Sequence, residues 1–220
     1  MMCDKKDRFL LLTAAAVLAA ALVLAGCSDD DPVGTGIPVV TQPESPDQLL
    51  TVFRTAYEAG DLGQYLALLD QGYLTLLSPV TMNDFPTLGA SLDAAREKSI
   101  HEKMFSGLDF TDPDGYPVPA VEAIAFGVFL RMDLWQPTDD EEHFPGAEWA
   151  PFSVQILFDR GQQYWTSRVD GIVKIYIRAH ETGTGGAKKT YYLLAGMVDL
   201  TGMAKGSEST SWGNVKALYR

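Results

Sequence analysis

The sequence predicts an α+β domain in which short helices come first and long strands follow. Before Gly107, apolar residues recur at the spacing of amphipathic helices, and glycines stand where those helices would end. After Gly107, apolar and polar residues alternate over long runs separated by glycine-rich gaps, which is typical of antiparallel strands joined by hairpins. Helices followed by a strand meander make an α+β architecture around one core.

The first two helices are predicted from their ends. Ser45 is a suitable N-cap and Pro46 suits the first helical position, so the first helix begins there and ends at Gly60. Asp61 caps a second, shorter helix, which ends before Gly72. A third helix is predicted over 91–105.

The remaining elements are predicted from alternation of apolar and polar side chains. Strands are predicted over 73–77, 123–135, 152–158, 171–180, 190–200 and 212–220. With the three helices they form a single domain over 46–220, which is long enough to bury a substantial core.

The N-terminal segment has the three parts of a secretory signal. Three basic residues precede an apolar run from Phe9 to Gly26, and the run ends in small residues before Cys27. Its last four residues, "LAGC", resemble the lipobox of bacterial lipoproteins. That resemblance implies cleavage after residue 26 and lipidation of Cys27 with acyl chains such as palmitate. A transmembrane anchor is the alternative for an apolar run of this length.

Residues 27–45 are predicted to be a lipidated cysteine followed by a tether. Asp, Pro, Gly, Ser and Thr dominate this stretch, and it has no apolar period. The acidic run from Asp29 to Asp31 is interpreted as a solvated spacer. Ser28, and not aspartate, follows the cysteine, which resembles lipoproteins sorted to the outer membrane, facing the periplasm. The predicted location is therefore the bacterial envelope, with a lipid anchor.

Composition excludes several classes of function. The formal net charge of −12 and the absence of a basic stripe argue against nucleic acid as a partner. The two cysteines, Cys3 and Cys27, both precede the domain, so it has neither a disulfide framework nor a cysteine nucleophile. The three histidines have no metal-ligand spacing. No cofactor motif is recognised, so no cofactor and no metal are predicted.

The segment "LLTVFRTAYEAGDLGQYLALLDQGYLTLL" resembles the opening of the nuclear transport factor 2-like superfamily. The shared features are an aromatic residue in the first helix, a Gly-Asp pair between helices, and an early tyrosine in the second helix. The final "SWGNVKALYR" resembles the last strand of secreted members. The resemblance implies three N-terminal helices packed on a strongly curved antiparallel sheet, which together form a cone with a mostly apolar mouth.

The same resemblance implies a ligand pocket. Tyr57, Tyr65 and Tyr73 would come from successive elements near the mouth, and His101 from the helix that covers it. His101 is also the weak candidate for a catalytic base, paired with the adjacent Glu102. A surface histidine is the alternative, because adjacent helix residues point in different directions.

Other polar motifs are interpreted as loops. Asp70 is expected at a solvated helix end. The stretch 109–115 breaks the calcium-loop pattern and favours a β-turn. The acidic stretch 138–146 is interpreted as a solvated loop, and 183–190 as a hairpin tip.

Three functions follow from these observations. The first is a non-enzymatic envelope lipoprotein whose cone-shaped pocket binds a small apolar ligand or a protein partner. The second is an enzyme of the cyclase, isomerase or dehydratase type, which a buried acid–base pair in the cone would favour. The third is a structural or assembly module, including a homodimer through the sheet, which a filled cone would favour.

Overall fold

The computed structural model describes residues 42–112, 114–183, 188–201 and 210–220. The predicted signal peptide, Cys27 and almost all of the predicted tether lie outside these residues. Within the described part of the chain, no helix is long and apolar enough to cross a membrane. The described residues belong to one compact unit that begins at Val40.

The predicted helices are present, with the predicted caps. Helix α1 (Pro46–Ala59) begins at Ser45, whose side chain accepts a hydrogen bond from the Gln48 amide, and ends at Gly60 in the left-handed region. Asp61 caps α2 (Leu62–Ala67) in the same way. The third helix, α4 (Ala94–Met104), starts later than predicted, because Asp93 is its N-cap.

Two short helical pieces separate these elements. They are α3 (Pro79–Asp84) and the 3₁₀ turn η1 (Pro86–Leu88), and neither was predicted. The start of the predicted third helix is instead a strand, β2 (Ser91–Asp93), which pairs with β1 (Leu69–Leu76). β1 itself is longer than the brief strand predicted over 73–77.

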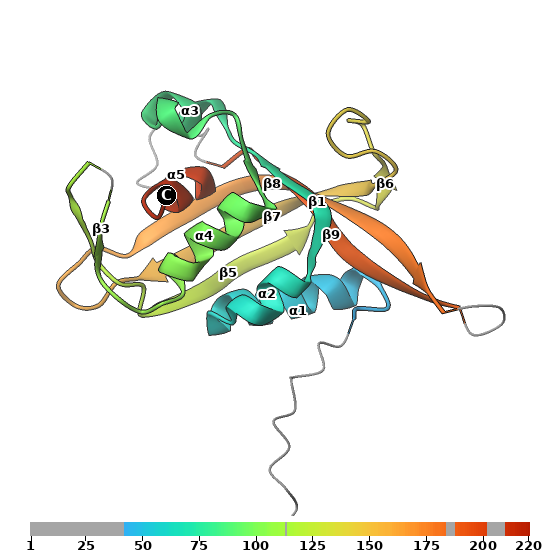
Figure 1. Cartoon of the computed structure of the whole chain (residues 1–220), viewed down its shortest axis with the longest axis horizontal. Coiled ribbons are helices and arrows are strands. Elements are labelled where there is room, and N and C mark those ends of the chain that lie inside the picture. The colour runs from blue at the N-terminus through green and yellow to red at the C-terminus, as the bar shows by residue number, and fades with distance from the viewer. Residues whose placement is uncertain (1–41, 113, 184–187, 202–209) are drawn as a thin grey trace, which may run out of the picture. The chain divides into compact units, whose positions relative to one another are not determined.

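The main sheet contains the long strands β5 (Ala123–Arg131), β7 (Glu148–Asp159), β8 (Ser167–Thr182) and β9 (Lys189–Asp199), in the order β2-β1-β9-β8-β7-β5 (Figure 1). The short β6 (Gln136–Pro137) pairs with β7. The prediction of a wholly antiparallel sheet is wrong, because β1 and β9 run parallel. A β-hairpin of β3 (Phe110–Thr111) and β4 (Pro117–Val118) stands apart from this sheet.

The predicted last strand is wrong as well. Trp212–Ala217 form a helix, α5, whose N-cap Ser211 accepts a hydrogen bond from the Asn214 amide. The alternation over 212–220 resembles a strand, but Trp212, Val215 and Tyr219 also lie three or four residues apart and all three are buried. The N-cap at Ser211 favours the helical pattern over the strand pattern.

Helices α1, α2, α4 and α5 lie on one face of the sheet (Figure 1). They enclose the main core, which joins the helices to the inward side chains of β5, β7, β8 and β9. The fold is therefore α+β, with N-terminal helices on a mixed sheet.

A smaller apolar cluster lies on the opposite face. The stretch 138–146, expected to be solvated, buries Phe144 against Tyr176, with ring centroids 4.0 Å apart. Gly196 permits this contact, since a Cβ there would overlap the Phe144 ring and the carbonyl oxygen of Leu74. The expectation of a wholly solvated loop is wrong at this residue.

Candidate functional site

The four residues predicted for a pocket come together in the interior. Tyr57 on α1, Tyr65 on α2, Tyr73 on β1 and His101 on α4 are each at most 2% exposed. The expectation of a surface histidine is therefore wrong. The rings of Tyr65 and His101 pack against each other at a tilt of 35°, with ring centroids 4.3 Å apart.

Glu97, which the sequence analysis did not single out, is the centre of this cluster. Its Oε1 accepts hydrogen bonds from Lys216 Nζ at 2.6 Å and Thr75 Oγ1 at 2.5 Å. Its Oε2 accepts from the Tyr65 hydroxyl at 3.2 Å and lies 3.2 Å from His101 Nδ1. The carboxylate partner of His101 is thus one helical turn earlier, and not the adjacent Glu102.

Tyr57 links the histidine to α5. His101 Nδ1 lies 2.7 Å from the Glu97 carbonyl oxygen, so donation there leaves Nε2 to accept from the Tyr57 hydroxyl at 3.1 Å. The same hydroxyl accepts a hydrogen bond from Trp212 Nε1 at 3.0 Å. Each ring nitrogen of the buried histidine therefore has a partner.

The ionisation states follow from burial and from Lys216. Burial opposes ionisation of the Glu97 carboxyl, but Lys216, with His101, outweighs it, and the pKa of Glu97 is lowered. Burial lowers the pKa of His101 to about 4, although Glu97 acts in the opposite direction. At neutral pH the cluster holds an ionised Glu97–Lys216 pair beside a neutral imidazole. We call these residues the Glu97 network: Tyr57, Tyr65, Tyr73, Thr75, Glu97, His101, Trp212 and Lys216.

Helix α5 closes one side of the Glu97 network. Asp199 Oδ2 accepts from the Gly213 amide and Thr201 Oγ1 accepts from the Trp212 amide, both at 2.7 Å. Burial raises the pKa of Asp199, although the hydrogen bonds it accepts oppose that rise. A cavity of only about 10 Å³ remains beside Lys216 and Thr75, which is room for about one water molecule.

The other titratable candidates lie outside this cluster. Asp70 is not solvated as expected but 5% exposed, and it forms an ion pair with Arg178 and lies 3.4 Å from His180. The predicted turn at 109–115 is confirmed, since Asp112 Oδ1 accepts from the amides of Asp114 and Tyr116. Among the described residues, no cluster of side chains suited to a metal ion occurs.

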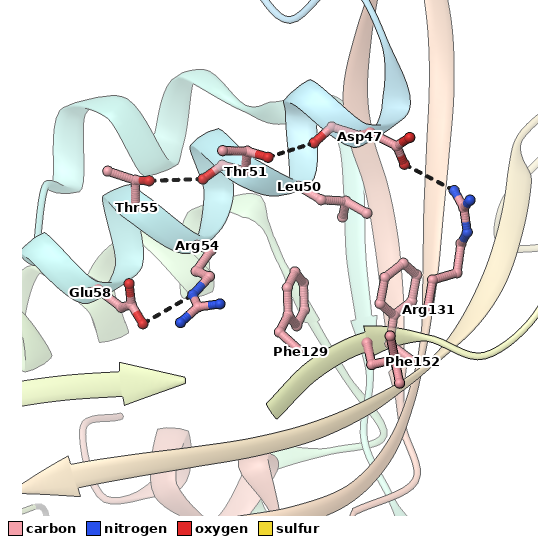
Figure 2. A pocket seen from close by; sticks show the side chains of 10 residues that line it. Asp47, Leu50, Thr51, Arg54, Thr55, Glu58, Phe129, Arg131 and Phe152 are labelled. Carbon is pink, nitrogen blue, oxygen red and sulfur yellow. Dashed lines mark hydrogen bonds and ion pairs between the residues drawn. The ribbon is translucent and has the colours of Figure 1, made fainter. Parts of the chain in front are cut away.

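Cavities large enough for a ligand lie nearer the surface, and the predicted tyrosines do not line them. One, of about 490 Å³, is an open groove between α1 and β5 (Figure 2). A second of about 320 Å³ lies beside α4 near Arg220, and a third of about 530 Å³ lies beside Arg160. The first is called the α1–β5 groove below.

The α1–β5 groove has charged ends and an apolar floor. At one end Arg131 forms an ion pair with Asp47 at 3.0 Å, and at the other Arg54 pairs with Glu58 at 3.1 Å (Figure 2). The floor between them is lined by Leu50, Phe129 and Phe152.

The Arg54–Glu58 pair also binds the edge of β5. Arg54 Nη2 donates to the carbonyl oxygen of Phe126 at 3.0 Å, and the Phe126 amide donates to Glu58 Oε1 at 2.9 Å. Helix side chains thus make the hydrogen bonds that a neighbouring strand would make to this residue.

The comparisons with known proteins add a distant likeness. No protein-family model and no curated protein matches the chain. A solved structure, that of AusH from Aspergillus nidulans, aligns with 74% of this chain and 88% of its own at 12% sequence identity, with a TM-score of 0.41. At that identity and TM-score the likeness supports no statement about activity.

Proposed function

We propose that the chain is a non-enzymatic binding module of the bacterial envelope, lipid-anchored at Cys27, that holds a protein partner at the α1–β5 groove. Its fold would be that of the nuclear transport factor 2-like superfamily, with the cone filled by the chain itself. The observation that carries the proposal is the contrast between a closed interior and an open groove. The Glu97 network leaves about 10 Å³ inside, whereas the groove offers about 490 Å³ outside.

A small apolar ligand in the cone is the weaker form of this function. It would have to replace side chains that are at most 2% exposed and that satisfy one another's hydrogen bonds. Breaking such bonds costs roughly 1–3 kcal/mol for each buried polar group left without a partner. A partner at the groove incurs no such cost.

The anchor is tested by replacing Cys27 with serine. Metabolic labelling with a palmitate analogue should mark the wild-type protein and not the variant, which should accumulate as precursor. Fractionation should place the wild-type protein with the outer membrane. Lipid labelling of Cys27→Ser, or membrane association of its processed form, would remove this part of the proposal.

The groove is tested by photo-crosslinking in cells. The photoreactive residue p-benzoylphenylalanine is placed at Thr55, which lines the groove, and at Lys98, an exposed residue of α4. A discrete protein adduct should form from Thr55 and not from Lys98. The same adducts from both positions, or none from either, would contradict a partner at the groove.

One observation favours an enzyme as the second candidate. Glu97 and His101 form a buried acid–base pair with Nδ1 and Oε2 3.2 Å apart, and buried pairs with shifted pKa values are typical of catalytic sites. Catalysis would require α5 to move and admit a substrate. Native mass spectrometry of the purified protein distinguishes the two candidates, because an enzyme or ligand carrier of this type would retain a small molecule in the interior.

A homodimer or assembly module is the remaining alternative. The exposed apolar side chains on and beside β5, Leu130, Met132 and Leu134, are 63%, 54% and 73% exposed and would supply its contact. Sedimentation velocity at several concentrations tests it, and a monomer throughout would exclude a dimer through the sheet.

A further inference from the structure

We propose that the partner's binding element is an extended, uncharged peptide segment that adds as a strand to the free edge of β5 inside the α1–β5 groove. This inference rests on the proposed function and names the chemistry of its partner. Three observations support it. The backbone of β5 has an edge without a partner strand in the described part of the chain, side chains of α1 already form hydrogen bonds with part of that edge, and the charges of the groove balance.

Among the residues that the structure describes, β5 is the last strand of the sheet, so only one of its edges is paired with another strand. That edge bonds to β7, with a register shift between Phe126 and Val128. Phe126 directs its amide and carbonyl groups away from β7, to Glu58 and Arg54. Beyond the shift, Met132 donates to the Pro151 carbonyl and so faces β7.

The backbone groups of residues along β5 face its two edges alternately. The orientation of Met132 therefore fixes that of the residues between it and the register shift. Backbone groups of successive residues in an antiparallel strand point to opposite edges, so those of Phe129 and Arg131 point away from β7, into the groove. Within the described part of the chain, no hydrogen bond from a side chain of α1 reaches the backbone of either residue. Side chains of α1 make the hydrogen bonds of a neighbouring strand to Phe126. Among the described residues, they make none to the backbone of β5 where the groove opens.

The two threonines on the helix wall of the groove have no hydroxyl proton left for an incoming backbone. Thr51 and Thr55 each donate their hydroxyl to a carbonyl one turn earlier in α1, at 2.9 Å (Figure 2). The backbone donors that an incoming strand would need are therefore on β5. A volume of about 490 Å³ falls within the range of ligand pockets, roughly 300–1,000 Å³, and suits a few residues of extended chain.

The side chains around the groove favour apolar residues in the segment. Alternate side chains of an added strand point to opposite faces. One set would meet the floor mainly at the half-buried Phe129, since Leu50 and Phe152 are 8% and 2% exposed. The other would lie beside the exposed Leu130 and Met132, which no described element covers.

The charge of the groove favours an uncharged segment. Two arginines and two carboxylates line it and are joined in two ion pairs, so the groove is balanced within a chain of net charge −12. A strongly charged peptide would have to break one of these pairs, whereas a neutral strand is complementary to a neutral site.

The test uses peptides and the described domain with its tether. The probes are four capped pentapeptides, acetyl-Ser-X-Thr-X-Ser-amide, in which X is Val, Ile, Leu or Phe. In two-dimensional NMR, at least one should shift the amide signals of Phe129, Arg131 and the Leu50–Thr55 turn. N-methylation of its central residues removes backbone donors and should weaken binding roughly tenfold, which corresponds to about 1.4 kcal/mol.

A matched pair of variants locates the site. Thr51→Trp fills the groove and should abolish the shifts, and Lys98→Trp on α4 should preserve them. If Thr51→Trp does not fold, the comparison of N-methylated with unmodified peptides still tests whether binding depends on backbone hydrogen bonds. Shifts that survive both Thr51→Trp and N-methylation would overturn the proposal, as would the absence of shifts with all four peptides.

The inference and the proposed function can fail separately. If crosslinking from Thr55 captures a partner but none of the peptides binds, the groove is a binding site for a folded surface and strand addition is wrong. If neither experiment gives a signal, the proposed function fails with it.

Discussion

Two regions of the domain each contain a carboxylate paired with a basic side chain, and they differ in almost everything else. In the Glu97 network, Glu97 and Lys216 are at most 1% exposed, and every oxygen of the carboxylate has a partner. At the mouth of the α1–β5 groove, Asp47 is 79% exposed and Arg131 is 31% exposed. The two pairs therefore differ in burial: the inner pair joins α4 to α5 within the core, and the outer pair remains exposed to solvent.

The largest expected effect comes from removing the carboxylate of Glu97. Glu97→Ala leaves the Lys216 ammonium buried without its partner, and breaking a buried pair in this way costs about 3–5 kcal/mol. Urea denaturation should show that loss in the free energy of unfolding. Glu102→Ala, on the same helix but exposed, should change stability by no more than about 0.5 kcal/mol. Equal effects of the two variants would mean that the network does not hold the interior together.

His101 makes stability depend on pH. Its pKa is about 4 in the folded domain, against 6.5 as its ordinary value, because burial disfavours the imidazolium. Between those values the unfolded chain binds a proton that the folded domain does not, so stability falls as pH drops from about 6.5 to about 4, by up to about 3 kcal/mol. The raised pKa of Asp199 acts in the opposite direction, so the wild type is compared with His101→Gln.

The difference between those two stability curves measures the histidine together with its coupling to Glu97. It should change across that window and be flat above it. An NMR titration of the His101 ring should have its midpoint near pH 4. A midpoint at or above 6 would show that water reaches the ring, and the interior would have to be treated as a pocket.

The hydroxyl of Tyr57 is expected to have a smaller effect. Tyr57→Phe keeps the ring but leaves Trp212 Nε1 and His101 Nε2 without their partner. The expected loss is about 1–3 kcal/mol, because buried polar groups would be unsatisfied. Thermal unfolding measures it, and Tyr116→Phe, whose ring is exposed, is the control. No change in Tyr57→Phe would show that water enters and replaces the hydroxyl.

The sequence predicted the helices well and the interior only in part. Ser45, Gly60 and Asp61 act locally, and local signals identified α1 and α2. The parallel pairing of β1 with β9 depends on segments that are distant in sequence. Helix α5 was missed because residues 212–220 also alternate like a strand, and only the N-cap Ser211 distinguishes the helix. Glu97 lies four residues before His101, and that spacing could have identified it as the partner in place of Glu102.

Lys216 could not have been found by the same reasoning. It is 119 residues from Glu97 in the sequence. A lysine in a short helix or strand is normally exposed to solvent, so its sequence position did not suggest a buried partner. The α1–β5 groove was missed for a related reason. It lies beside β5 past the register shift between Phe126 and Val128, and although Gly127 marks that break in the strand, it does not say which helix packs beside it.

The smallest effect on stability is expected at the groove. Asp47→Ala and Arg131→Ala should each destabilise the domain by less than about 1 kcal/mol, and a double-mutant cycle should give a coupling of roughly 0.2–1 kcal/mol that salt reduces. Chemical denaturation at low and high salt measures both. A coupling as large as that of a buried pair would mean that the groove is closed in solution.

Chemical modification of the three histidines tests most directly whether the interior is closed. Diethyl pyrocarbonate reacts with neutral, accessible imidazoles, and at pH 6 the folded domain keeps His101 neutral, so only access limits its reaction. The side chains of His143 and His180 are 39% and 29% exposed, whereas that of His101 is 0% exposed. Peptide mass spectrometry of the folded protein should therefore show His143 modified and His101 intact until denaturant is added, whereas His180 is a poorer control because its Nε2 is buried beside Asp70. Modification of His101 at a rate close to that of His143, in a protein that is still folded, would contradict the closed interior and favour the enzyme.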